Sequence, residues 1–156
     1  MLSDWQALSA ESKATDIVSL MSHQKVPVTV NCLTNNWVKG IETLMLIYKI
    51  FRADEWAVLR DTGQTLGAPI DVSDRFVHFS TGKQVAQTCE KYFAGEEGLI
   101  LLVLDSDELG DALKWETSRG GDLFPHLYRE LRMQDVFWHT DLPLGPDGHI
   151  FPEGVL

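Results

Sequence analysis

The chain has 156 residues, which suits one domain whose core needs no metal or disulfide to hold it together. Its 13 basic and 23 acidic residues give a formal charge of -10, the opposite of the basic surface that long nucleic acids require. No apolar run approaches the roughly 18 residues of a membrane span, and Cys32 and Cys89 lie too far apart in sequence to specify a disulfide framework. We therefore expect a cytoplasmic protein that binds neither membrane nor long nucleic acid.

The first part of the chain carries weaker patterns than the rest. The stretch "SDWQALSAESKATDIVSLMSH" has the composition of a capped helix, but "KVPVTVNCLTNNWVKG" mixes turn residues with scattered apolar ones. Every stronger pattern follows Met45, which opens the apolar, β-prone run "MLIYKIF". We expect residues 1–44 to be a helical or weakly structured extension and residues 45–156 to be the folded domain.

The first elements of that domain are predicted from periodicity and from turn residues. The sequence favours a strand over 46–51 and a helix over 54–62 that ends at Gly63. The stretch "GAPIDVSD" over 67–74 is predicted to be a loop, since its proline is unsuited to the middle of a strand. The aromatic run over 75–80 is predicted to be a strand.

Later elements add one helix and several strands. Ser80 or Thr81 is expected to cap a helix that reaches about Phe93, and "LILLVLD" over 99–105 has the apolar character of a strand buried on both faces. "ALKWE" and "MQDVFWHTD" are predicted to be strands, and "TSRGGDLFPHLY" between them an ordered loop. Because helices and strands do not alternate as βαβ units, the predicted fold class is α+β.

A histidine and a serine mark the first candidate site. In a strand, His78 and Ser80 would share one face, and there an imidazole and a hydroxyl suit recognition of a ribose. Thr81 belongs to the helix start in "STGK", which is suited to an anion. The competing interpretation is a core histidine whose ring bonds a backbone carbonyl. The site hypothesis requires a partly accessible His78 within about 10 Å of the 119–128 segment, the reach of a small ligand.

The loop after "ALKWE" carries a second cluster. Gly120 and Gly121 permit a close ligand approach, and Arg119 could bind a phosphate. The alternative for Arg119 is an ordinary surface ion pair with Glu116 or Asp122.

The three histidines after His78 divide into one candidate and two others. His126 and Tyr128 would face one side of an extended segment, so we expect both at the ligand site. His139 and His149 have carboxylates nearby, but their spacing matches no recognised metal site, and we expect no metal.

Several consecutive motifs resemble a known family. "IYKIF", "EWAVLRDTG", "APIDVSDRFVHFST", "YFAG", "LKWE", "SRGGDLFPHLY" and "PLGPDGHIFP" look like the small, mostly bacterial proteins catalogued as domain of unknown function nine-five-two. The resemblance runs from about Met45 to Pro152. That family is similar in fold to the ADP-ribosyltransferases, and particularly to RNA 2′-phosphotransferases, which implies a split mixed β-sheet with flanking helices that clasps NAD.

The resemblance also implies places for particular residues. "VHFS" looks like a strand ending of the phosphotransferases, which puts His78 and Ser80 beside the nicotinamide-ribose, while Lys49 stands where those enzymes carry a histidine. Nicotinamide would leave through an oxocarbenium-like state, with Glu116 or Asp122 as the stabilising carboxylate.

We therefore expect a transferase that acts on NAD or on a phosphorylated ribose. The alternatives are a non-catalytic module with the same pocket and a protein-interaction domain. NAD is expected as a substrate, the partner as a small nucleotide-like ligand, and the protein as a monomer or weak dimer. The expected catalytic residues are His78 and Glu116, and the expected ligand-binding residues are Lys49, Ser80, Thr81, Arg119, Gly120, Gly121, His126 and Tyr128.

Overall fold

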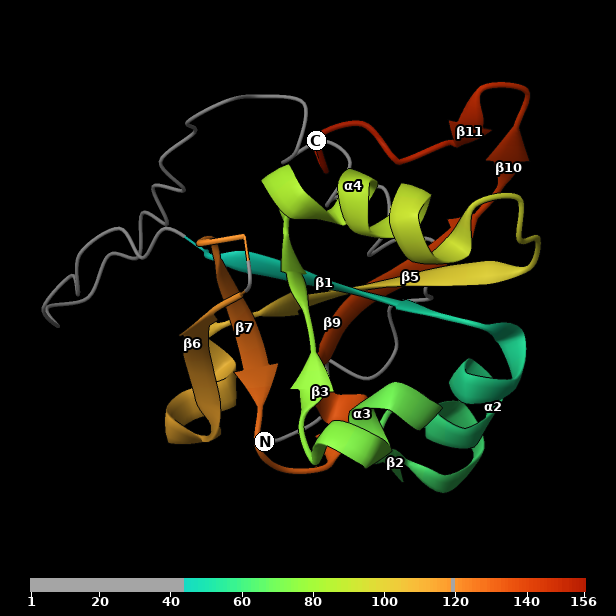
Figure 1. Cartoon of the computed structure of the whole chain (residues 1–156). Coiled ribbons are helices and arrows are strands. Elements are labelled where there is room, and N and C mark those ends of the chain that lie inside the picture. Colours follow the sequence, from blue (N-terminus) through green and yellow to red (C-terminus); the bar gives the residue numbers. More distant parts are fainter. Residues whose placement is uncertain (1–43, 119) are drawn as a thin grey trace, which may run out of the picture. The chain divides into compact units, whose positions relative to one another are not determined.

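The computed structural model describes residues 44–118 and 120–156, so the expectations for residues 1–43 and for Arg119 lie outside the described residues. The larger of two compact units spans Leu44–Phe151 with Leu156, and it holds every element named below (Figure 1). Within the described part of the chain, each helix is too short or too polar to cross a membrane.

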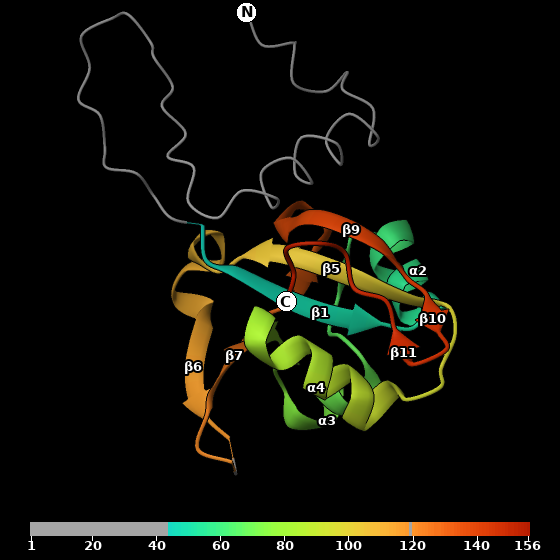
Figure 2. The same ribbon diagram turned by 90° about the horizontal axis from the view of Figure 1, so that it is seen from above.

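A four-stranded sheet forms the centre of this unit. Its order is β4 (Ser80–Thr81), β1 (Leu46–Phe51), β5 (Leu99–Asp105) and β9 (Val136–Leu142). The last three strands run side by side in Figure 2, and all neighbours are antiparallel. The expected interior position of the "LILLVL" strand is confirmed, because β5 pairs with a strand on each side and almost all its residues are buried.

A separate three-stranded sheet has the order β3 (Val77–His78), β7 (Leu123–Leu127) and β6 (Leu113–Thr117). Here β7 takes up much of the second half of the expected ordered loop, since the two glycines turn the chain back and β6 and β7 form a hairpin.

Two small two-stranded sheets complete the β structure. The short strands β2 (Gln64–Thr65) and β8 (Leu131–Arg132) pair with each other, as do β10 (Leu144–Gly145) and β11 (Gly148–His149). The α+β class is confirmed. The expected mixture of parallel and antiparallel strands is wrong, since every strand pair in the described residues is antiparallel.

The expected strand over 75–80 is also wrong. The chain instead makes two strands of two residues, and these belong to different sheets. Phe79 lies between them, its ring is buried in the core, and its N–H donates to the carbonyl oxygen of Pro125 at 2.9 Å. The chain crosses from one sheet to the other at Phe79, so His78 and Ser80 do not lie on one continuous strand.

Two helices follow their predictions and one was missed. The helices α2 (Ala53–Thr62) and α4 (Gly82–Phe93) form as expected, and Gly63 ends α2 with a φ of 82°. The predicted loop over 67–74 is instead the helix α3 (Pro69–Asp74), because proline is accommodated at the first helical position and Asp71 accepts the N–H of Ala68. In Figure 1, α4 lies on one side of β1 and β5, and α2 and α3 lie on the other.

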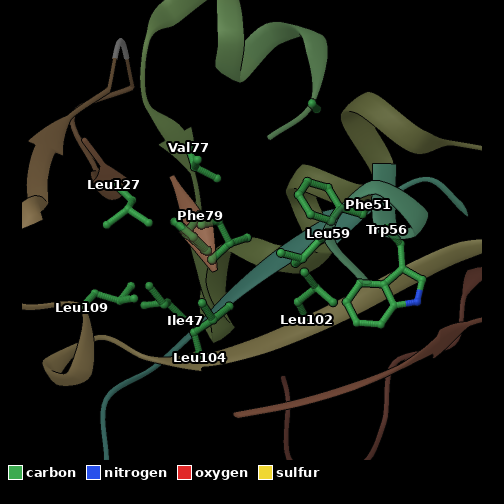
Figure 3. Packing of buried hydrophobic residues seen from close by; sticks show 12 residues of the cluster. Ile47, Phe51, Trp56, Leu59, Val77, Phe79, Leu102, Leu104, Leu109 and Leu127 are labelled. Carbon is green, nitrogen blue, oxygen red and sulfur yellow. The ribbon is translucent and has the colours of Figure 1, made fainter. Parts of the chain in front are cut away.

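Two short 3-10 helices, η1 (Asp107–Ala112) and η2 (Met133–Asp135), connect strands. The main core lies between β1, α2, β5 and the inner face of β3 and β7, whose side chains point toward one another in Figure 3. Its buried members are Ile47, Phe51, Trp56, Leu59, Ala68, Val77, Phe79, Leu102, Leu104, Leu109, Leu127 and Leu131.

Candidate functional site

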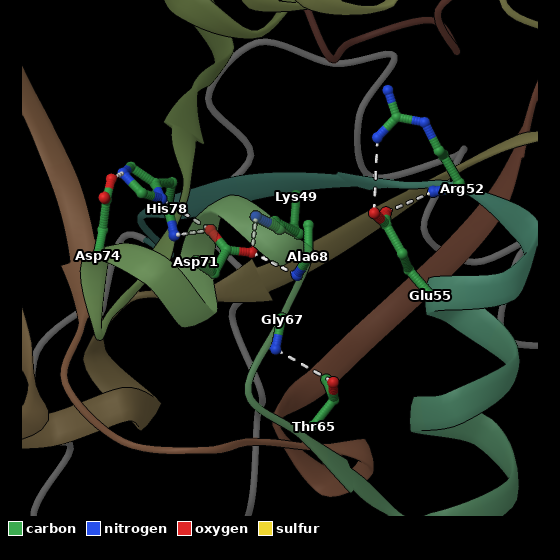
Figure 4. A network of polar contacts seen from close by, with 9 residues as sticks. All are labelled: Lys49, Arg52, Glu55, Thr65, Gly67, Ala68, Asp71, Asp74 and His78. Carbon is green, nitrogen blue, oxygen red and sulfur yellow. Dashed lines mark hydrogen bonds and ion pairs between the residues drawn. The ribbon is translucent and has the colours of Figure 1, made fainter.

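A buried carboxylate links the central sheet to His78. Asp71 of α3 is fully buried, and its Oδ2 accepts hydrogen bonds from Lys49 Nζ at 2.6 Å and from the Ala68 N–H at 2.7 Å (Figure 4). Its Oδ1 lies 3.0 Å from the backbone nitrogen of His78 and 2.7 Å from Nδ1 of the ring. Four partners therefore satisfy a charge that burial would otherwise make costly.

The protonation state of Asp71 follows from these partners. Burial alone would raise the pKa of Asp71, but the hydrogen bond from His78 and the charge of Lys49 outweigh it and hold the pKa below its ordinary value. Burial lowers the pKa of Lys49, and the charge of Asp71 opposes that shift. Because an ionised carboxylate only accepts hydrogen bonds, Nδ1 of His78 donates to Asp71.

A second carboxylate holds a second histidine. Oε2 of Glu116 lies 2.7 Å from Nδ1 of His126 and accepts the Tyr128 hydroxyl at 2.8 Å. The hydrogen bonds from His126 and Tyr128 lower the pKa of Glu116, and the same contact raises the pKa of Tyr128. Thus His126 has the same kind of carboxylate partner, on the same ring nitrogen, as His78.

The strand register brings the two imidazoles together. His78 of β3 pairs directly with His126 of β7, and their ring centroids lie 5.1 Å apart. Phe76 packs on both rings, with centroid distances of 4.6 Å to His78 and 4.4 Å to His126, and lies 5.1 Å from the ring of Tyr128. We call Phe76, His78, Glu116, His126 and Tyr128 the histidine cluster.

The alternation of the strands explains why this cluster faces outward. Val77 and Leu127 pair across β3 and β7 and enter the core, so their neighbours His78 and His126 point to the other face of the sheet. The His78 side chain is 34% exposed and that of His126 13% exposed. His78 is thus partly accessible and close to the 119–128 segment, as the site hypothesis requires, and it bonds a carboxylate where the competing interpretation requires a carbonyl.

Two other predicted binding residues are turned inward. Lys49 lies on the core face of β1, and Asp71 is its partner. Ser80 is 5% exposed and donates its hydroxyl to Thr88 at 3.1 Å. Neither side chain belongs to the open surface beside His78.

At the start of α4, a side chain of the same helix accepts the hydrogen bond of the N-cap backbone N–H. The Thr81 N–H donates to Gln84 Oε1 at 3.0 Å, and Gln84 Nε2 donates to the carbonyl oxygen of Leu123 at 2.9 Å. The Thr81 N–H, one of the donors expected for an anion at this terminus, is therefore already engaged.

Gly120 and Gly121 belong to the turn of the β6–β7 hairpin, where their N–H groups bond Ser118. The N–H of Gly120 donates to the Ser118 hydroxyl at 3.3 Å, and the N–H of Gly121 donates to the Ser118 carbonyl at 3.0 Å. Asp122, the alternative carboxylate, accepts the Ser118 N–H with its backbone oxygen at 2.8 Å.

The other two histidines of the described residues lie elsewhere. The ring of His139 packs on Trp56 at 4.5 Å, and burial lowers its pKa, while Nε2 of His149 lies 2.7 Å from the Glu96 carbonyl oxygen. Across the described residues, no three His, Cys, Asp or Glu side chains are grouped as metal ligands.

Sequence reasoning missed Asp71 and Phe76. The signal for Asp71 was present, because an acid two residues after a proline is typical of the first turn of a helix. Its burial depends on Lys49, which is distant in sequence and pairs with it only in the folded state.

Comparison with known proteins places the chain in a family. Residues 50–139 match the model described as "Protein of unknown function (DUF952)". The chain belongs to this family. The solved structures similar to this DUF952 protein include the crystal structure of CC0527 from Caulobacter crescentus, at 44% identity and a TM-score of 0.64, covering 67% of this chain and 91% of that one.

The solution structure of CC0527 is similar as well, at 43% identity and a TM-score of 0.62, covering 70% of this chain and 93% of that one. No curated protein matches this DUF952 chain. The family expected from the motifs is thus confirmed.

Proposed function

We propose that this DUF952 domain binds a ribose-bearing, nucleotide-like ligand such as NAD or ADP-ribose over the histidine cluster and transfers a group at the ribose. The observation that supports it is the pair of imidazoles 5.1 Å apart, each bonded through Nδ1 to a carboxylate. A carboxylate on Nδ1 fixes the ring orientation and the tautomer, which prepares Nε2 for acid–base work; Nε2 of His78 also lies 3.2 Å from Asp74 Oδ2, which a ligand at this ring would have to displace. The substrate class is the one implied by the sequence motifs, through the likeness of their family to the ADP-ribosyltransferases.

The chemistry at this cluster divides between the two histidines and Glu116. The bond between ribose C1′ and the nicotinamide nitrogen breaks, and its electron pair leaves with nicotinamide. An acceptor hydroxyl oxygen then bonds C1′, and its proton passes to one imidazole. The other imidazole accepts a hydrogen bond from a ribose hydroxyl through Nε2. The Glu116 carboxylate, which is 44% exposed, stabilises the positive charge that develops on the ribose.

A non-catalytic module with the same ligand is the second candidate. Glu116 favours it, because its Oε2 already accepts from His126 and Tyr128, which offsets the negative charge available to an oxocarbenium-like state. The two candidates differ in one measurement, the release of nicotinamide from NAD over time.

Thermal melting with NAD, ADP-ribose and a 2′-phosphorylated nucleotide tests the proposal. A ligand at about 100 times its dissociation constant should stabilise the wild-type fold by roughly 2.7 kcal/mol. His78→Ala and His126→Ala should each remove most of that stabilisation. The control is Tyr92→Ala, at a residue of α4 that is 60% exposed, and it should respond as the wild type does. A wild type that none of the three ligands stabilises would overturn the proposal.

A further inference from the structure

A hollow of about 220 Å³ lies beside the histidine cluster, between α3 and the end of β7. It shares two walls with the cluster, because Phe76 and Tyr128 line it as well. The side chains of Leu66 and Val72, which are 55% and 51% exposed, add an apolar rim. The hollow is smaller than the 300 Å³ or more that is usual for a complete small-molecule site, so a ligand that enters it would also extend over the histidine cluster.

Two arginines line the hollow, and they differ in their partners. Arg129 donates to Asp135 at 2.7 and 3.0 Å and to the Glu130 carbonyl oxygen at 2.8 Å. Arg75 makes no ion pair or side-chain hydrogen bond with the other described residues, although the chain carries a formal charge of -10. Arg75 is therefore the cation at the hollow whose charge those residues leave unbalanced.

The backbone fixes the position of Arg75. It is the residue that ends α3, with a φ of 68°, and its N–H donates to the carbonyl oxygen of Asp71. The next N–H, of Phe76, donates to the same oxygen at 3.2 Å. The residue whose carboxylate orients His78 thus also positions Arg75 and Phe76, so the hollow and the cluster form one connected surface.

We infer that the hollow binds the aromatic base and a phosphate of a nucleotide whose ribose lies over the histidine pair. The base packs against Phe76, Tyr128 and the aliphatic rim, since an aromatic ring gains from stacking on another. The guanidinium of Arg75 pairs with the phosphate, because its fork of donors fits two phosphate oxygens. This inference rests on the proposed function and adds to it the place where the base and the phosphate bind and the residue that recognises the phosphate charge.

Calorimetric titration of the full chain with AMP, adenosine, ribose 5-phosphate and inorganic phosphate tests the inference. Wild type should bind AMP more tightly than each of the other three ligands. Higher salt should weaken the binding of AMP more than the binding of adenosine. Binding of inorganic phosphate as tight as that of AMP would overturn the role of the base.

Variants at Arg75 test how much its positive charge contributes to AMP binding. Arg75→Gly removes the guanidinium at a φ that glycine adopts readily, so the fold should not suffer, and AMP affinity should fall about tenfold to a hundredfold, as expected for a lost charge-assisted hydrogen bond. Adenosine affinity should stay the same. Arg75→Lys should lose less AMP affinity than Arg75→Gly. Arg60→Gln, at an exposed arginine of α2, is the control for net charge and should bind AMP as wild type does.

A second position tests the hollow without touching Arg75. Val72→Glu places a negative charge at the exposed rim and should also weaken AMP binding. If Arg75→Gly and Val72→Glu bind AMP normally while His78→Ala does not, the hollow is not the subsite and the proposed function stands. If His78→Ala binds normally and Arg75→Gly does not, the ribose does not lie at the histidines. A wild type that binds no nucleotide overturns both proposals.

Discussion

Asp71 and His78 join a fully buried carboxylate to a partly exposed imidazole, with Oδ1 of the first 2.7 Å from Nδ1 of the second. The other oxygen of Asp71 is held by Lys49, which lies in the central sheet. Any displacement of Asp71 therefore also moves the ring of His78. The stability of the fold and the orientation of His78 depend on the same carboxylate.

The first prediction concerns the charge balance of this pair. Asp71→Asn keeps the size of the side chain but leaves Lys49 as a buried cation without its anion, so we expect a loss of roughly 3–5 kcal/mol in the free energy of unfolding. The double variant Asp71→Asn with Lys49→Met removes both charges and should recover a large part of that loss. Urea unfolding of the two single variants and the double variant measures the coupling. If the loss in the double variant equals the sum of the losses in the two single variants, the two charges are not coupled and the prediction is wrong.

The second prediction is the direction of the pH dependence. The folded-state pKa of Asp71 lies below its ordinary value of 3.8, so the unfolded chain takes up this proton first as the solution becomes acidic. The stabilisation is complete above that ordinary value and is lost as the pH falls through the folded-state pKa. Unfolding free energies between about pH 7 and pH 2 should fall less steeply in Asp71→Asn than in wild type. Parallel curves in the acid range would contradict the prediction.

The sequence predicted best where one short segment determines its own structure. The β5 run has six consecutive apolar residues, Leu99–Leu104, and its buried central position followed from that pattern alone. Gly63 ended α2 as expected because a left-handed helix end is a local preference.

The helix α3 was missed although its signal, Pro69 at the first helical position, is local, but the other failures depend on partners distant in sequence. The chain between His78 and Ser80 looks like one strand, but Phe79 is drawn into the core and the two neighbours pair with different strands. Four of the five cluster residues were named, His78, His126, Glu116 and Tyr128. The pairing of His126 with Glu116 depends on the β7–β6 register, and that of His78 with Asp71 on the position of α3. Asp71 was missed because Lys49 makes its burial tolerable.

The third prediction tests the core. Leu102 of β5 is fully buried among β1 and α2 side chains, so Leu102→Ala should cost about 2–5 kcal/mol through lost contacts and a cavity. The matched control is Leu123→Ala, because that leucine is 52% exposed and its truncation should change stability by less than about 0.5 kcal/mol. Thermal and urea unfolding measure both. An equal loss in the two variants would show that burial is not the cause.

The fourth prediction concerns the fragment 45–156. All members of the main core lie between Ile47 and Leu131, so the fragment retains every buried residue of that cluster. We expect it to unfold in one cooperative transition and to bind the same ligands as the full chain. Circular dichroism on heating measures the transition. A broad, gradual loss of signal would mean that the preceding residues are needed to complete the fold.

The last prediction uses two glycines that have similar backbones and different surroundings. Gly63 and Gly67 have φ angles of 82° and 96°, so alanine should strain either one by about 1–2 kcal/mol. A Cβ at Gly63 meets no atom within 4 Å, whereas a Cβ at Gly67 would overlap the side chain of Asp71. Gly67→Ala should therefore introduce the backbone strain and also disrupt the hydrogen bonds of Asp71, and destabilise the fold by several kcal/mol more than Gly63→Ala. It should also weaken ligand binding through His78, which Gly63→Ala should not. Urea unfolding and ligand titration of both variants measure this difference, and similar results for the two would show that Asp71 tolerates displacement.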